Sequence, residues 1–179
     1  MTIRNLEYLF KPRSIAVVGR GKQASGPDVT VQFNLIEGGF KGPVMPINPD
    51  QQSVSGVLAY RDIASLPVTP ELAILTTPLD EAPALIHELG ARGTRAALLL
   101  SREILQDHRG AKTALLSPDL SRKHSDDGEA LKQKILEAAK PYLLRIMGPD
   151  HLGYAVPSTY LNASLSCTRP LAGHIALLC

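Results

Sequence analysis

Short apolar runs alternate with amphipathic stretches along this chain of 179 residues. Five of the runs have the length and the aliphatic composition of strands that are buried on both faces, and each ends near a glycine, a proline or a small polar residue. These predicted strands are 14–19, 43–49, 71–78, 95–101 and 143–149.

Helical spacing marks three stretches between the runs, at 29–39, 79–93 and 127–142. Acidic residues open the second stretch and glycines end the first two, which is typical of helix starts and stops. On the first helix one face is predicted to be buried, and its apolar residues are Val29, Phe33, Leu35 and Ile36.

Strands that alternate with helices at these distances need right-handed crossovers, and such crossovers produce a mostly parallel sheet. The predicted fold class is therefore α/β, a Rossmann-like doubly wound parallel sheet with helices on both faces. In such a sheet, ligands bind beyond the carboxyl ends of the strands. The residues at these ends are Gly19, Asn48, Thr77, Ser101 and Gly148.

The polar segment 102–126 interrupts this alternation, because it is too long for an ordinary connection from a strand to a helix. We predict either a mobile insertion or a short helix over 102–108, and mobility is favoured for 112–126. From Gly153 onward the sequence is rich in turn formers, and a strand-like run then ends the chain.

The change of pattern near residue 150 predicts two units. The first, 1–150, is the Rossmann-like domain. The second, 151–179, is a linker with the first strand of a truncated second domain. On this interpretation the chain is a piece of a longer protein.

The overall composition excludes several partners. A net charge of +2 is too small to indicate a nucleic acid or an anionic membrane, and 4% aromatic residues with no Trp offer few surfaces for stacking on bases. No secretory signal or membrane-spanning run is present, so we expect a cytoplasmic protein. Cys167 and Cys179 have no metal-ligand spacing, and no metal site or catalytic residue is predicted.

The turn after the first predicted strand carries the candidate chemistry. Gly19 ends an apolar run and is followed by a loop that contains Gly21, Gly26 and the cations Arg20 and Lys22. The backbone amides of such a turn, together with the positive end of the next helix, are suited to binding phosphates. The pattern therefore indicates a nucleotide-type cofactor.

The end of the second predicted strand narrows the choice of cofactor. An NAD site usually has an acidic residue there, which binds both hydroxyls of the ribose. This chain has Asn48, and Asp50 follows only beyond Pro49. The pattern disfavours a dinucleotide dehydrogenase and leaves open a ligand whose adenine ribose carries a 3′-phosphate.

Five collinear segments resemble a known family. They are PRSIAVVG, NLIEGGFKGPVMPINP, SVSGVLAYRDIASLP, ELAILTTP and RIMGPDHLGYAVP. Over about residues 6–178 the chain is similar to the CoA-binding domain shared by NDP-forming acyl-CoA synthetases, the succinyl-CoA synthetase α subunit and bacterial protein lysine acetyltransferases. GGFKGPVMPINP and AYRDIASLPVTPELAIL look closest to the acetyltransferases, which join this region to a GNAT domain.

The resemblance implies a site for CoA or acyl-CoA. It implies that the CoA diphosphate lies on the turn 19–26, the adenosine lies near Asn48, and the pantetheine arm passes 76–78 and Ser101 toward 148–150. The implied cofactor-binding residues are Gly19, Arg20, Gly21, Lys22, Ser25, Gly26, Asn48, Pro49, Thr76, Thr77, Pro78, Ser101, Gly148, Pro149 and Asp150.

Two aspartates depart from the family's pattern. Asp28 stands where the family has a small residue that opens the helix, and Asp150 replaces the asparagine of Gly-Pro-Asn. A carboxylate about 4 Å from a phosphate costs about 1 kcal/mol in water and about 4 kcal/mol at an effective dielectric constant of 20. We therefore predict weak, salt-dependent CoA binding in which Arg20 and Lys22 offset the repulsion.

The leading hypothesis is a non-catalytic, CoA- or acyl-CoA-sensing N-terminal domain of a protein lysine acetyltransferase. Its partners would be the missing C-terminal domains of the same chain, and a homo-oligomer is compatible with this role. The alternative is the CoA-binding part of an NDP-forming acyl-CoA synthetase, which is an acid–thiol ligase. A second alternative is a degenerate domain that only acts as a scaffold.

Overall fold

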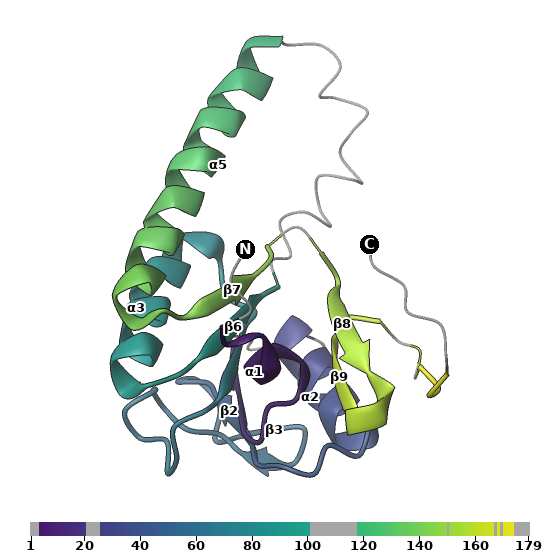
Figure 1. The fold of residues 1–179 in the computed structure, drawn as a ribbon. Coiled ribbons are helices and arrows are strands. Elements are labelled where there is room, and N and C mark those ends of the chain that lie inside the picture. Colours follow the sequence, from purple (N-terminus) through teal and green to yellow (C-terminus); the bar gives the residue numbers. More distant parts are fainter. Residues whose placement is uncertain are drawn as a thin grey trace.

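A sheet of five parallel strands forms the centre of the computed structural model, in the order β2-β1-β5-β6-β7 (Figure 1). Its strands are β1 Ile15–Val18, β2 Val44–Ile47, β5 Leu72–Leu75, β6 Ala96–Leu99 and β7 Arg145–Met147. Each lies within a predicted strand, so the prediction of a Rossmann-like α/β fold is confirmed. The structure describes residues 4–20, 26–100, 118–149, 151–166, 168 and 170–173, with the backbone alone over 118–127.

The remaining elements surround this sheet. The helices are α1 Leu6–Phe10, α2 Pro27–Glu37, α3 Ala82–Arg92 and α5 Pro118–Ala139, and short 3-10 turns are η1 Leu79–Glu81, η3 Lys140–Tyr142 and η4 Pro157–Thr159. Two antiparallel hairpins pair β3 Ser53–Val54 with β4 Val57–Leu58, and β8 Gly153–Val156 with β9 Leu161–Ser164.

Helices cover both faces of the sheet, and this is why β1, β5 and β6 are buried at every position. One face packs against α3 and α5, through side chains such as Ile86 and Ile135. The other face packs against α1, α2 and β9, through side chains such as Leu35 and Leu161. The layer order is therefore helix, sheet, helix (Figure 1). Ligands of such sheets bind beyond the carboxyl ends of the strands.

The buried face of α2 differs from the predicted face. Leu35 is buried as expected, but Phe33 and Ile36 are 56% and 40% exposed. Gln32 is fully buried instead. Its Nε2 donates a hydrogen bond to the carbonyl of Val54 over 2.6 Å, while its Oε1 is buried without a partner among the described residues. Counting apolar residues misplaces this face because the polar residues Asp28 and Gln32 share it.

Helix α5 begins at Pro118, well upstream of the predicted start at residue 127. Pro118 and Asp119 suit the first turn of a helix, where proline and acidic residues are favoured. Residues 118–126, for which mobility is predicted, are therefore helical, and the mobility itself stays a prediction. The predicted short helix over 102–108 lies outside the described residues.

The hairpin of β3 and β4 was not among the predicted elements, although the sequence contains a signal for it. Ser55 and Gly56 connect the strands and have φ angles of 48° and 78°. Positive φ at both residues is the backbone of a type I′ turn, which suits the twist of a two-residue hairpin. After β4 the chain returns beside β2, where the Tyr60 N–H donates to the carbonyl of Pro46 over 2.8 Å.

The turn-rich segment after residue 150 contains the hairpin of β8 and β9, which packs against α2. Its Leu161 and Ala163 are 1% and 0% exposed and belong to the core on the α2 side of the sheet. This part of 151–179 is thus joined to the first domain by buried contacts. The division of the chain at residue 150 stays a prediction, and residues 174–179 lie outside the described part.

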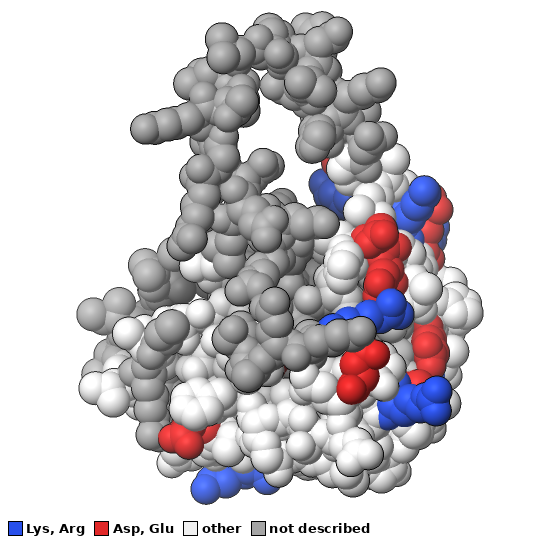
Figure 2. Space-filling model, turned by 180° about the vertical axis from the view of Figure 1, so that it is seen from behind, with Lys and Arg blue, Asp and Glu red and all other residues white. Residues whose placement is uncertain are grey.

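Charges of both signs are mixed over the described part of the face in Figure 2, where Lys and Arg lie among Asp and Glu. That part of the surface therefore does not present one continuous basic patch. Among the described residues, no helix combines the length and the apolar character needed to cross a membrane.

The buried phenol of Tyr154 makes the stability of this fold sensitive to alkaline pH. Its hydroxyl donates to the carbonyl of Leu9, and burial raises the pKa of the phenol well above its ordinary value of about 10. The folded state therefore keeps this proton above pH 10 while the unfolded state loses it. Stability should fall as pH rises from about 10 toward the raised pKa, by at most about 1.4 kcal/mol per pH unit.

Urea unfolding at a series of pH values between about 9 and 11 measures this loss. The variant Tyr154→Phe should lose less stability over that range than the wild type, because it has no phenol to ionise there. The matched variant Tyr160→Phe removes a phenol that is half exposed and should behave like the wild type. Equal losses in all three proteins would contradict the prediction.

Candidate functional site

Hydrogen bonds hold neighbouring strands side by side at the carboxyl edge of the sheet, by which we mean the side on which the carboxyl ends of its parallel strands lie. The Gly19 N–H donates to the carbonyl of Ile47 over 3.0 Å, and the Thr76 N–H donates to the carbonyl of Val18 over 2.9 Å. The chain passes from β1 to β2 on one side and then to β5 on the other, so the switch point of the topology lies at the end of β1. Ligands of doubly wound sheets bind at such points.

Two cavities open at this edge. The smaller, of about 210 Å³, lies between the ends of β1, β2 and β5 and the first half of α3, and Gly19, Arg20, Thr77 and Glu88 are among its lining residues. The larger, of about 450 Å³, lies beyond the end of β2 and is lined by Asn48, Pro49, Asp50, Gln51, Gln52, Ala59 and Arg61. Pro49 and Arg61 line both, so the two cavities are neighbours.

The two threonines after β5 have different roles. The Thr76 hydroxyl donates to the carbonyl of Val18 over 2.9 Å, so it joins β5 to β1. Thr77 is 5% exposed, lines the smaller cavity, and its buried hydroxyl oxygen has no hydrogen-bond partner in the described structure. Because a buried hydroxyl without a partner is costly, Thr77 is the better candidate for a hydrogen bond to a ligand.

Asn48 holds the loop that follows β2. Its Oδ1 accepts a hydrogen bond from the Asp50 N–H over 2.9 Å, and its own N–H donates to the carbonyl of Tyr60 over 2.9 Å. The residue is 1% exposed although it lines the larger cavity. Its amide therefore shapes the cavity wall, and no carboxylate takes the place at which an NAD site binds the ribose hydroxyls.

The amino end of α2 points to the end of β1, as the predicted phosphate turn requires. Gly26 is the N-cap of α2, and Pro27 begins the helix. Asp28 follows, and its carboxylate lies over Gly19 so closely that a Cβ at Gly19 would be 2.5 Å from Oδ2. The site thus has the glycine and the helix end that favour a phosphate, together with a carboxylate that opposes one.

The predicted phosphate ligand Arg20 already has an anionic partner. Its guanidinium donates to Glu81 Oε1 over 3.0 Å, at the start of α3, and its side chain is 59% exposed. An exposed ion pair of this kind is weak, so a phosphate can compete for the guanidinium. Arg20 is consequently a partly satisfied cation at the rim of the smaller cavity.

Arg61 is the residue of this site that the sequence analysis missed. It is exposed, lines both cavities, and forms no ion pair or hydrogen bond with a described residue. One signal was available, because Arg61 is the only Lys or Arg between Lys41 and Arg92. The fold brings it to the site through the return of the chain beside β2.

The remaining predicted residues divide into two groups. Gly148 follows β7 with φ of +104°, and a Cβ there would lie 2.4 Å from the carbonyl oxygen of Leu99, so glycine lets this turn approach the end of β6. Gly148, Pro149 and Pro78 therefore follow strands at the same edge. The others lie outside the described residues, namely Gly21, Lys22, Ser25, Ser101 and Asp150.

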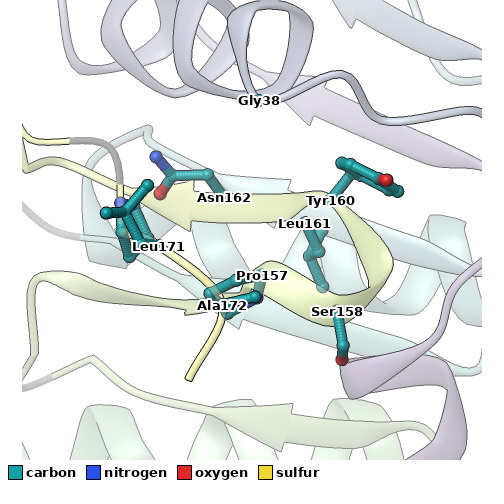
Figure 3. A pocket seen from close by; sticks show the side chains of 9 residues that line it. Gly38, Pro157, Ser158, Tyr160, Leu161, Asn162, Leu171 and Ala172 are labelled. Atoms are coloured by element: carbon teal, nitrogen blue, oxygen red, sulfur yellow. The ribbon is translucent and has the colours of Figure 1, made fainter.

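A further cavity lies at the other end of α2. Its volume is about 340 Å³, and Gly38, Tyr160, Leu161 and Asn162 are among its lining residues (Figure 3). None of the described residues that line it is charged, so these residues offer no cation to a phosphate. It is therefore a poorer candidate for a nucleotide than the carboxyl edge.

The family model described as a CoA binding domain matches residues 13–157. The chain belongs to this family. The match runs from the residues before β1 through both cavities and ends just after β8.

The relatives are longer proteins. Acetate–CoA ligase (ADP-forming) I subunit alpha of Pyrococcus furiosus is 25% identical over 97% of this chain, which spans 35% of that protein. Acetate–CoA ligase (ADP-forming) I of Archaeoglobus fulgidus is 28% identical over 97% of this chain, which spans 22% of that protein. The chain therefore spans between a fifth and about a third of the length of these relatives.

Solved structures agree with this family. Dinucleotide forming acetyl-coenzyme A synthetase 1 of Ca. Korarchaeum cryptofilum, in its apo form, has a TM-score of 0.71 and 29% identity, covering 89% of this chain and 31% of that chain. These relatives are ligases and a synthetase, so they support the synthetase alternative better than the leading acetyltransferase hypothesis. The link to lysine acetyltransferases finds no support among them.

Proposed function

We propose that this chain is the CoA-binding portion of an ADP-forming acyl-CoA synthetase and acts together with further domains or subunits. The observation that carries this proposal is the match, over nearly the whole chain, to the alpha subunit of an ADP-forming acetate–CoA ligase. The site supports it as well, because a glycine at the end of β1, a helix amino end and two neighbouring cavities suit a long ligand with phosphates.

In this proposal each part of the site binds one part of CoA. The diphosphate lies at the amino end of α2 beside Gly19, with Arg20 released from Glu81 to meet it. The adenosine and its 3′-phosphate enter the larger cavity, where Arg61 supplies the cation. Thr77 donates or accepts a hydrogen bond along the pantetheine arm. When bound, CoA supplies the thiol that an acid–thiol ligase joins to an acyl group.

Calorimetric titration of the chain with CoA tests this proposal. Binding of CoA should release or absorb measurable heat. NAD at the same concentration should give no heat of binding, because the end of β2 lacks an acidic residue for its ribose. Incubation of the chain with ATP, acetate and CoA should give no acetyl-CoA above a buffer control, because its proposed role is binding alone. A lack of heat with CoA at millimolar concentration would contradict the proposal.

A further inference from the structure

Asp28 is a buried carboxylate without a partner among the described residues. It is 4% exposed, and its buried Oδ1 accepts no hydrogen bond from that part of the chain. It forms no ion pair with any residue in the described part of the chain. A buried charged group is costly unless something compensates it, so this oxygen calls for a cation or a hydrogen-bond donor from outside the described protein.

The position of this carboxylate coincides with the proposed diphosphate position. Asp28 lies in the first turn of α2, an eleven-residue helix, and its side chain covers Gly19 at the end of β1. The positive end of α2 favours one anion there, and the carboxylate already supplies it. A diphosphate that approaches the same turn therefore meets a negative charge at short range.

The two described cations at this site, Arg20 and Arg61, do not neutralise Asp28. Arg20 is paired with Glu81 at 3.0 Å, and Arg61 lines the cavities on the β2 side. Neither contacts Asp28. We propose that Asp28 and the diphosphate of CoA bind one divalent cation between them, with Mg²⁺ as the natural ion, so that CoA binds this chain as its magnesium complex. This inference rests on the proposed function.

The chemistry of Mg²⁺ fits a site of this composition. Mg²⁺ is usually held by one or two carboxylates together with the phosphates of a ligand, and it keeps several waters. The described residues contain no group of three or more His, Cys, Asp or Glu that could hold a metal without help. Asp28 therefore provides one oxygen ligand, the diphosphate and waters provide the others, and the ion binds more tightly when CoA is bound.

Calorimetric titration of CoA into the full chain, in MgCl₂ and in EDTA with KCl added to equal ionic strength, tests the inference. Mg²⁺ should tighten CoA binding to the wild type by about fivefold or more. Because the coupling is reciprocal, CoA should raise the affinity for Mg²⁺ by the same factor. In EDTA the variant Asp28→Asn should bind CoA more tightly than the wild type, and Mg²⁺ should not change its affinity further.

The matched variant is Asp80→Asn, which removes an exposed carboxylate from η1, outside both cavities, and should respond to Mg²⁺ like the wild type. Asp28→Ser is a second neutral variant in case Asp28→Asn does not fold. An equal response of wild type and the neutral variants to Mg²⁺, or no response of the wild type, would overturn the proposed Mg²⁺ bridge between Asp28 and the diphosphate. If CoA still binds in that case, the proposed function is upheld. Absence of CoA binding by every protein in both buffers would overturn the proposed function and the bridge with it.

Discussion

Replacing Leu161 with Ala should lower the free energy of unfolding by about 2–5 kcal/mol. Leu161 is 1% exposed and lies in β9, where it belongs to the hydrophobic core together with Val31 and Leu35 of α2. Removal of its side chain leaves a cavity between the hairpin and the helix, and a packed core fills such a cavity only in part. Urea or thermal unfolding of the chain measures the change.

The matched variant for this experiment is Leu171→Ala, because Leu171 is 87% exposed and its truncation should change stability by less than about 0.5 kcal/mol. Leu161→Val, with an expected loss of about 1 kcal/mol, keeps the series measurable if the alanine variant does not fold. Equal stability of the Leu161 and Leu171 variants would mean that residues beyond 150 are an independent linker. A large loss for Leu161→Ala would place the hairpin in the same cooperative unit as the sheet.

Replacing Arg61 with Ala should weaken CoA binding about tenfold or more. A hydrogen bond to a charged group contributes about 1.5–3 kcal/mol, and about 1.4 kcal/mol corresponds to a factor of ten in affinity. Arg61 lines both cavities and has no ion-pair partner among the described residues, so its guanidinium is available for a phosphate. Titration of both proteins with CoA and with dephospho-CoA measures the effect.

The loss should be smaller with dephospho-CoA, because that ligand lacks the phosphate assigned to Arg61. Arg95→Ala is the matched control, because its removal changes the net charge equally. Arg95 is exposed and directly precedes β6, at the amino ends of the strands and away from the site. The Arg95 variant should bind CoA like the wild type. Similar affinities of the two variants, or equal losses with the two ligands, would contradict the assignment of Arg61 to the 3′-phosphate.

The candidate site could be predicted from the sequence only in outline. Gly19 at the end of β1, and Asn48 and Thr77 at the ends of the next strands of the sheet, lie at one edge as expected, because parallel strands end on the same side. Arg61 was missed because its place depends on how the chain turns back after the β3–β4 hairpin. The role predicted for Arg20 stays a prediction, and its pairing with Glu81 could not be foreseen.

The sequence by itself determined the parallel sheet, because buried strands carry a local signal of aliphatic runs that end at turns. Only the tertiary structure decided how the charged side chains of the site are arranged and paired. Arg20 and Glu81 are 61 residues apart in the chain, and Asp28 covers Gly19 only because α2 begins beside β1. Contacts of this kind form between elements that the sequence pattern treats separately, so only their packing in space reveals them.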